Sequence, residues 1–215
     1  MKKNGFTLAE VLITLAIIGV VATMTLPSLM TNTAEQQAKS AFKKGINTLT
    51  EAAQMSQAID GYSYESLTSD DTTSDAAQSL FGLLARRTQI DFARSKTGGH
   101  TGDSGNFAVF FRDGSILTFP GNATGNATTA AEMQDDNLPY GIEVLYDTNG
   151  LKGPNQISNC QGSAAGISRT GGSDTGDASL CNVKANRVIK DQFGIRLRGG
   201  YAVPNGAAAK WVFEN

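Results

Sequence analysis

The chain has 215 residues and a formal net charge of −2, with 18 Lys and Arg residues against 20 Asp and Glu. The positive charges form no basic stripe, so the composition argues against strong nonspecific binding to nucleic acid. One histidine and two cysteines provide neither a nucleophile with its base nor a metal motif of recognised spacing. The sequence therefore does not predict an enzyme.

The amino-terminal segment contains the most informative pattern, MKKNGFTLAEVLITLAIIGVVATMTLPSLM. An apolar run extends from Phe6 to Leu26, and its only charge is Glu10. As a helix this run measures roughly 31 Å, which is enough to cross a bilayer. Because a carboxylate at bilayer depth costs about 2.5–3.5 kcal/mol, we expect Glu10 to have a partner.

Two simpler interpretations explain this segment less well. A cleaved secretory signal has a shorter apolar run of roughly 7–15 residues and then a small-residue cleavage site, and residues 22–24 do not form a clean one. An ordinary membrane anchor fits the length but does not account for Glu10 or for the Gly5-Phe6 pair.

The pattern K-K-x-G-F-T-L-x-E, followed by a long apolar run, resembles the type III signal of type IV prepilins and type II secretion pseudopilins. The resemblance implies that a prepilin peptidase cuts after Gly5 and N-methylates the new first residue, Phe6. It also implies that Glu10 pairs with the amino terminus of a neighbouring subunit. Gly19 and Pro27 fall where pilins carry a helix glycine and a helix-loosening proline.

The same resemblance implies a function and a location. We expect a pilin-like structural subunit that assembles through its amino-terminal helix into a type II secretion pseudopilus or a type IV pilus-like fibre. The alternative is a minor pilin that acts as a binding module in DNA uptake or adhesion. The implied partners are prepilin peptidase, copies of the chain itself, other pilin-like subunits of a helical fibre, and inner-membrane assembly machinery, but not nucleic acid. Lys2 and Lys3 predict a single-pass inner-membrane protein with a cytoplasmic amino terminus and a periplasmic or extracellular head.

Four segments are predicted: a leader at 1–5, a membrane and assembly helix at 6–27, an amphipathic continuation of that helix at 28–60, and a globular head at 61–215. Proline removes a helical hydrogen bond, so we expect a kink or local melting at Pro27. Beyond it, apolar residues recur at spacings of three and four and form one stripe for packing. The stripe consists of Ala34, Ala38, Ala41, Phe42, Gly45, Ile46, Leu49, Ala52, Ala53 and Ile59.

The first part of the head is expected to be a polar loop at 61–75 and a short helix. Ser74 or Asp75 is the expected cap of that helix, which the sequence places at 76–87. The glycine-rich stretch 97–106 lacks the Gly-Lys-Ser/Thr ending of a phosphate loop, so it is expected to be a surface turn.

The rest of the head is expected to form a small antiparallel sheet. Asp113-Gly114, between two apolar runs, predicts a hairpin over 107–119 with a type I′ turn. The expected class is α+β, a long helix packed on the sheet, which resembles the ladle shape of pilins and pseudopilins. Further strands are expected at 140–146, 193–197, 201–203 and 210–213.

Two cysteines, Cys160 and Cys181, lie in a loop-rich stretch of the predicted head. In the oxidising compartment outside the membrane, an even pair of this kind indicates a disulfide. Closing a loop of about 20 residues would stabilise the head by roughly 3 kcal/mol in the chain-entropy model. Two free buried thiols are the alternative.

The stretch DTNGLKGPN, which begins at Asp147, alternates oxygen-bearing side chains with glycines that let the backbone fold inward. Such a loop can hold a hard cation such as Ca²⁺, and major pseudopilins carry a calcium site in a comparable loop. The stretch departs from an EF-hand loop, because Leu151 replaces the third acidic position and no Glu stands at position twelve. A tight Asx-rich turn without metal is the alternative. The candidate ligands are the side chains of Asp147, Asn149, Asn155 and Asp191 and the carbonyl of Leu151.

Overall fold

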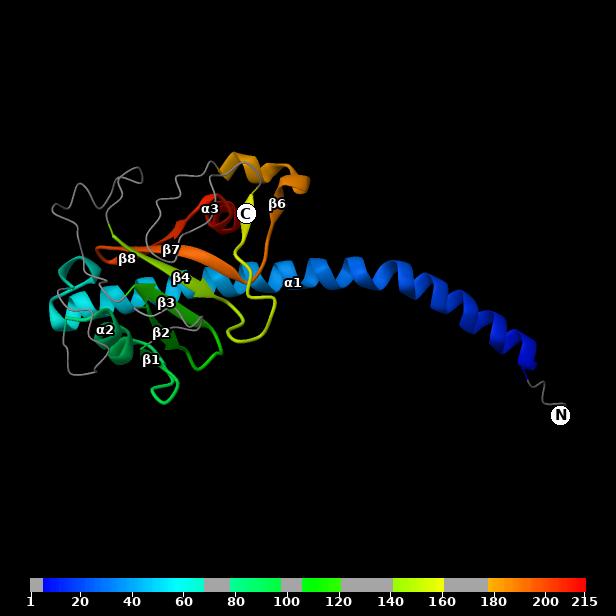
Figure 1. The fold of residues 1–215 in the computed structure, drawn as a ribbon, viewed down its shortest axis with the longest axis horizontal. Helices are drawn as coiled ribbons and strands as arrows, with labels where there is room; N and C mark the ends of the chain where they lie inside the picture. The colour runs from blue at the N-terminus through cyan, green and yellow to red at the C-terminus, as the bar shows by residue number, and fades with distance from the viewer. Residues whose placement is uncertain (1–5, 68–77, 98–105, 121–140, 161–177) are drawn as a thin grey trace. The chain divides into compact units, whose positions relative to one another are not determined.

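The computed structural model describes residues 6–67, 78–97, 106–120, 141–160 and 178–215 (Figure 1). The chain forms two compact units, an amino-terminal unit at Met1–Gln37 and a head at Ala38–Asn215. The head combines helices with an antiparallel sheet, so the expected α+β class is confirmed. The predicted leader lies outside the described residues.

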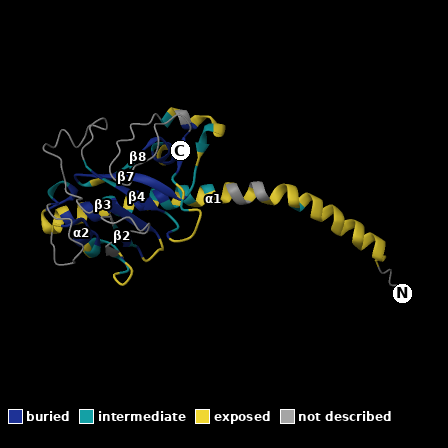
Figure 2. Cartoon of the chain, viewed as in Figure 1, coloured by how far each residue is buried: buried dark blue, intermediate teal, exposed yellow. Residues whose placement is uncertain are grey.

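Helix α1 extends from Leu8 to Asp60. Its stretch Leu8–Leu26 is long and apolar enough to span a membrane, and none of it is buried, as the yellow amino-terminal ribbon in Figure 2 shows. The hydroxyl of Thr14 donates to the carbonyl of Val11 at 2.9 Å, which satisfies it inside the helix as a bilayer interior requires. A kink or local melting was expected at Pro27; the helix continues through this residue without a break, so the local melting does not occur.

The head is built on a six-stranded antiparallel sheet with the strand order β1-β2-β3-β4-β7-β8. Its strands are β1 Lys96–Thr97, β2 Asn106–Phe110, β3 Ile116–Pro120, β4 Ile142–Asp147, β7 Gln192–Arg198 and β8 Tyr201–Asn205. A second sheet pairs β5 Asn159–Cys160 with β6 Arg187–Val188. The described chain also contains helices α2 Leu80–Arg87 and α3 Ala207–Glu214 and the 3₁₀ helices η1 Tyr64–Ser66, η2 Ala178–Asn182 and η3 Lys184–Asn186.

The part of α1 inside the head packs on the sheet through one apolar face. The ring of Phe42 stacks on that of Phe193 in β7, with 4.4 Å between the ring centroids. Ile59, which the predicted stripe included, is instead 68% exposed, so the packing face ends before the last turn of α1. The stripe is buried at Phe42, Gly45, Ile46, Leu49, Ala52 and Ala53.

Gly45 allows α1 to approach β4 closely. A Cβ atom at this position would lie 2.5 Å from Cε1 and Cζ of Tyr146, well inside van der Waals contact. Glycine costs a helix about 1 kcal/mol relative to alanine, so Gly45 weakens the helix locally. The absence of a side chain at Gly45 leaves room for the buried ring of Tyr146.

The predicted hairpin is formed by β2 and β3, but its turn differs from the prediction. The N–H of Gly114 donates to the carbonyl of Phe111, and the N–H of Phe111 donates to the carbonyl of Ser115, both at 3.0 Å. Gly114 has a φ of 96°, whereas Asp113 has a negative φ. A type I′ turn requires positive φ at both central residues, so the type I′ prediction is wrong and the hairpin has a longer loop that ends on Gly114.

Helix α2 is shorter than predicted and has a different cap. It begins at Leu80, and the hydroxyl of Ser79 accepts a hydrogen bond from the N–H of Gly82 at 2.8 Å. Ser79 therefore caps the helix in the role that the sequence analysis gave to Ser74 or Asp75, which lie outside the described residues.

The predicted last strand is a helix. Residues 210–213, expected to pair with 201–203, lie in α3. This helix opens with three consecutive alanines, and alanine is the strongest helix former. Gly206, with a φ of 100°, separates α3 from β8 in a backbone conformation that glycine adopts readily. The strand prediction is therefore wrong at the carboxyl terminus.

Candidate functional site

The amino-terminal end of α1 carries reciprocal hydrogen bonds between Thr7 and Glu10. The N–H and the hydroxyl of Thr7 both donate to Glu10 Oε2 at 2.8 Å, and the N–H of Glu10 donates to Thr7 Oγ1 at 3.3 Å. This is a capping box, in which side chains satisfy N–H groups that the first helical turn leaves unpaired. The T-x-x-E spacing of this box is visible in the sequence and is the signal that could have predicted it.

The surroundings of the capping box are apolar. Phe6 precedes α1 and is 90% exposed, whereas Gly5 lies outside the described residues. Glu10 is the only ionisable side chain between Leu8 and Leu26. A lone carboxylate on an exposed apolar helix is suited to compensate one positive group of a partner in a lipid environment.

A disulfide joins Cys160 in β5 to Cys181 in η2, the pair that the sequence analysis connected. The two Cα atoms are 5.4 Å apart, and both residues are buried. With both cysteines in this bond, the alternative of two free thiols does not apply. The disulfide ties the second sheet to the segment that leads into η3.

The only tryptophan of the chain connects three segments of the head. Trp211 in α3 donates from Nε1 to Asn182 Oδ1 at 3.1 Å. The side-chain cations of Lys39 in α1 and Arg187 in β6 lie over its ring, each 4.2 Å from the centroid. These cation–π contacts hold α1, β6 and α3 together.

Asp147, at the end of β4, begins the loop for which the sequence predicted a metal. Its Oδ1 accepts from the N–H groups of Asn149 at 3.2 Å and Gly150 at 2.9 Å, as in an Asx turn. Its Oδ2 accepts from Gln192 Nε2 at 2.9 Å. The carboxylate therefore organises the first half of the loop.

Asp191, which precedes β7, holds the second half of the same loop. Its Oδ2 accepts from the N–H of Asn155 at 2.7 Å, and its Oδ1 accepts from the N–H of Gln156 at 2.8 Å. The loop thus brings together Asp147, Asn155 and Asp191, three of the predicted ligands. Leu151 has a side chain that is 56% exposed.

The side chain of Asn155 points at three oxygen atoms. The amide atom that faces them lies 2.9 Å from the carbonyl oxygens of Gly150 and Lys152 and 3.3 Å from Asp147 Oδ2. With its nitrogen inward, Asn155 donates to all three oxygens and closes the loop without an ion. With its oxygen inward, four oxygens face one another, and a cation is needed to compensate their repulsion.

The donors of this loop suit a hard cation rather than a transition metal. All of them are oxygens, which hard cations prefer as ligands. Among the described residues there is no group of three or more His, Cys, Asp or Glu side chains that could hold a metal ion. The Oδ1 atom of Asn149 is buried without a hydrogen-bond partner. Burial raises the pKa of Asp147, and the negative charge of Asp191 raises it further. The hydrogen bond from Gln192 lowers this pKa, but the net shift is upward.

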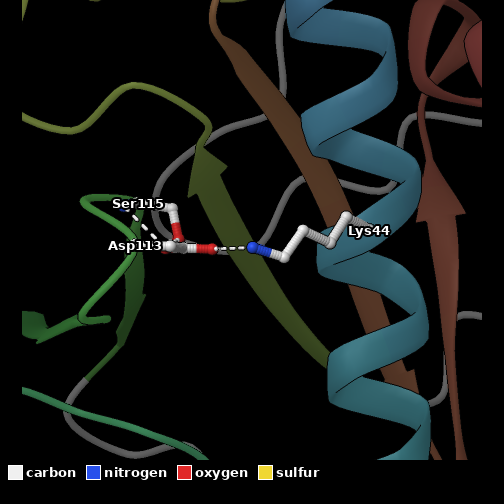
Figure 3. A network of polar contacts seen from close by, with 3 residues as sticks. All are labelled: Lys44, Asp113 and Ser115. Atoms are coloured by element: carbon white, nitrogen blue, oxygen red, sulfur yellow. Dashed lines mark hydrogen bonds and ion pairs between the residues drawn. The ribbon is translucent and has the colours of Figure 1, made fainter.

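The turn between β2 and β3 is fastened to α1 by a small polar network (Figure 3). Lys44 Nζ lies 2.8 Å from Asp113 Oδ2, and the Ser115 hydroxyl donates to Asp113 Oδ1 at 2.7 Å. Burial alone would raise the pKa of Asp113, but the bonds from Lys44 and Ser115 hold it below its usual range. The adjoining cavity of about 20 Å³, lined by Gly45 and Tyr146 among others, has room for about one water molecule.

Residues 1–26 match the family model described as the prokaryotic N-terminal methylation motif. The chain carries a type IV prepilin-like signal. This signal implies processing by a prepilin peptidase and assembly with other pilins, and it points to a structural subunit. The matched residues contain the predicted cleavage position, Glu10 and the apolar span, whereas the head lies outside the match. No curated protein and no solved structure matches the chain.

Proposed function

We propose that the protein is a structural subunit that assembles through its amino-terminal helix into a type II secretion pseudopilus or a type IV pilus-like fibre. The observation that carries this proposal is the prepilin-like signal on a helix whose apolar surface is exposed. Such a surface requires a cover, which lipid provides before assembly and the helices of other subunits provide afterwards. The heads would then form the surface of the fibre.

Processing prepares this helix for assembly. Cleavage after Gly5 removes Lys2 and Lys3 and leaves Phe6 as the first residue, with a methylated amine. In the fibre this amine meets Glu10 of a neighbouring subunit inside the helix bundle. A buried ion pair of this kind adds little net stability, but it fixes the register of the two helices.

Before assembly the subunit lies in the inner membrane as a single-pass protein. Lys2 and Lys3 keep the amino terminus in the cytoplasm, so the head is periplasmic. The disulfide in the head agrees with an oxidising compartment. The partners of the subunit are prepilin peptidase, the inner-membrane assembly machinery and other pilin-like chains, including copies of itself.

The test follows the chain and its Glu10 variants in the native host. Mass spectrometry of assembled wild-type protein should find a chain that begins at N-methyl-Phe6. Glu10→Val should insert into the membrane at least as well as the wild type, because it removes a charge from lipid, but it should be absent from fibres. Glu10→Asp, the matched control that keeps the charge, should retain part of the assembly. An intact Met1 in purified fibres, or Glu10→Val fibres at wild-type abundance, would refute the proposal.

We also propose that the loop 147–155 binds Ca²⁺ and that the ion orders the segment ahead of the disulfide. The support is the convergence of Asp147 and the carbonyls of Gly150 and Lys152 on the side chain of Asn155. Because the pKa of Asp147 is raised, its ionised form costs the folded head free energy at neutral pH, and a cation would remove that cost. Asp191 would hold the end of the loop in place through its hydrogen bonds with the N–H groups of Asn155 and Gln156.

Thermal unfolding of the head, expressed from Gln36 onward, tests the calcium proposal. A ligand that binds only the folded state stabilises it by about 2.7 kcal/mol at a hundredfold excess over Kd, so millimolar Ca²⁺ should raise Tm relative to chelator. Asp147→Ala should abolish this difference, whereas Asp113→Ala, outside the loop, should keep it. Asn155→Asp should enlarge it, because a second carboxylate, beside that of Asp147, would face the ion. Identical curves for the unmutated head in calcium and chelator would make the loop a metal-free turn.

A further inference from the structure

In the part of the head that the structure describes, two of the exposed apolar surfaces carry a charged side chain beside the apolar ones. The first is a row on α1 formed by Glu51, Met55 and Ile59, which are four residues apart and therefore share one face of the helix. Met55 is 51% exposed and Ile59 is 68% exposed, and Glu51 is exposed as well. These three residues are called the acidic row below.

The second surface, called the basic segment, consists of Val183, Lys184 and Val188, from the residue before η3 to the end of β6. Val183 is 56% exposed, Val188 is 42% exposed, and Lys184 is exposed. The N–H of Asn186 donates to the carbonyl of Val183 at 2.9 Å, which folds the segment into a compact turn. The basic segment thus carries two apolar side chains and one charge, as the acidic row does.

The two surfaces lie at opposite ends of the head. Lys39 and Arg187 both lie over the ring of Trp211, so β6 sits beside the first turn of the head's part of α1. The acidic row extends from about 18 to about 30 Å beyond Lys39, at 1.5 Å per helical residue. Figure 1 likewise shows β6 at one end of the head and the carboxyl end of α1 at the other.

The charges of the two surfaces are complementary. Glu51 and Lys184 have opposite signs, and neither forms an ion pair within the part of the chain that the structure describes. Copies in a helical fibre meet through two different surfaces, because a head-to-tail contact joins one patch of a copy to a different patch of the next. A matched pair of surfaces at the two ends meets this requirement.

We propose that the acidic row of one copy docks on the basic segment of a second copy of this chain. Met55 and Ile59 then pack against the two valines, and Glu51 lies beside Lys184. The inference rests on the proposed fibre function and adds the head surfaces that set the axial spacing between copies. The amino-terminal helices provide most of the association, and the head contact selects one displacement, because other displacements leave these charges unpaired.

Cross-linking in assembled fibres of the full chain tests the docking. Ile59→Cys combined with Val183→Cys, treated with a short bismaleimide, should give dimers and higher multimers of this chain. Each single variant should give no multimers beyond the dimer. Ile59→Cys combined with Phe92→Cys is the matched control, because Phe92 is 57% exposed but belongs to neither surface, and it should behave like the single variants.

Charge reversal provides a second, independent measurement. Glu51→Lys and Lys184→Glu should each lower fibre abundance severalfold, and their combination should restore it. The docking would be refuted if fibres of the Ile59→Cys and Val183→Cys double variant assemble normally but give no cross-linked multimers. It would also be refuted if the cross-linker joins this chain only to a chain of different mass. Either result would leave the proposed function unchanged. A wild-type chain that never enters fibres would instead refute the proposed function, and the docking with it.

Discussion

Replacing Gly45 with alanine should destabilise the head, even though alanine is the better helix former. The new Cβ would lie 2.5 Å from two ring atoms of Tyr146. Carbon atoms in contact are about 3.5–4.0 Å apart, so the ring and the helix would have to separate by roughly 1 Å. Tyr146 is buried between α1 and the β2–β3 turn, and its neighbours would have to move with it.

Two opposing effects set the size of the change. Forcing an extra methyl group into a packed core costs about 1–3 kcal/mol. The better helix propensity of alanine returns about 1 kcal/mol. We expect the packing cost to exceed the gain in helix propensity, with a net loss of up to about 2 kcal/mol in the free energy of unfolding.

Urea unfolding of the head, followed through the fluorescence of Trp211, would measure this loss. In a Tyr146→Ala background the obstructing ring is gone, so the same Gly45→Ala change should stabilise the head by up to about 1 kcal/mol. Ala58→Gly, at an exposed position of α1, measures helix propensity alone. A neutral or stabilising Gly45→Ala in the otherwise unmutated head would refute the close contact.

Two further predictions concern the disulfide and the β2–β3 turn. Cys160→Ser with Cys181→Ser should lower the free energy of unfolding by about 3 kcal/mol, because the unfolded chain regains the freedom of a loop of about 20 residues. An unchanged urea midpoint would contradict this. The pKa of Asp113 is lowered in the folded head, so its pairing with Lys44 stabilises the head above the unfolded pKa of about 4 and is lost as the pH falls further. Lys44→Met should therefore reduce the loss in the free energy of unfolding between about pH 5 and pH 3. The control Lys43→Met, at the neighbouring position, should not change this loss. Superimposable profiles of unfolding free energy against pH for Lys44→Met and the wild type would contradict the pairing.

Periodicity predicted those elements whose burial is set by their own sequence. The stripe from Phe42 to Ala53 has the spacing of a helix face whatever surrounds it. The hairpin was predictable because Asp113-Gly114 separates two apolar runs. The type of turn was not predictable in the same way. Asp113-Gly114 suits more than one turn, and the bonds of Phe111 to Ser115 and Gly114 selected the longer loop.

The missed helix α3 shows where local pattern is insufficient. Its eight residues are too few to form a stable helix in isolation. The helix is held through the ring of Trp211, over which the cations of Lys39 and Arg187 lie, and both of these residues are distant in the sequence. Trp211 and its aromatic neighbour Phe213 suggested a strand because aromatic residues are enriched there. Only the tertiary contacts decide between the two structures.

For the loop that begins at Asp147, the sequence indicated which side chains converge but not which carbonyl groups do. Asp147 and Asn155 were predictable because alternating oxygen side chains are a local pattern. The carbonyls of Gly150 and Lys152 were not, because carbonyl directions depend on the backbone. Here Gly150 and Asn155 have positive φ values of 71° and 49°, which the sequence alone does not specify.

The carboxylate of Glu10 is already hydrogen-bonded within its own chain, so joining the proposed fibre exchanges one set of partners for another. Exchanges of this kind have small net free energies, about 0.5–1.5 kcal/mol for each hydrogen bond. A subunit that leaves the fibre restores its bonds to Thr7 and returns to the membrane with its polar groups satisfied. In the proposed fibre, a small net free energy at this helix end would let subunits enter and leave the same filament repeatedly. The energy source of the assembly machinery, and not the affinity between subunits, would then decide whether the filament grows or shrinks.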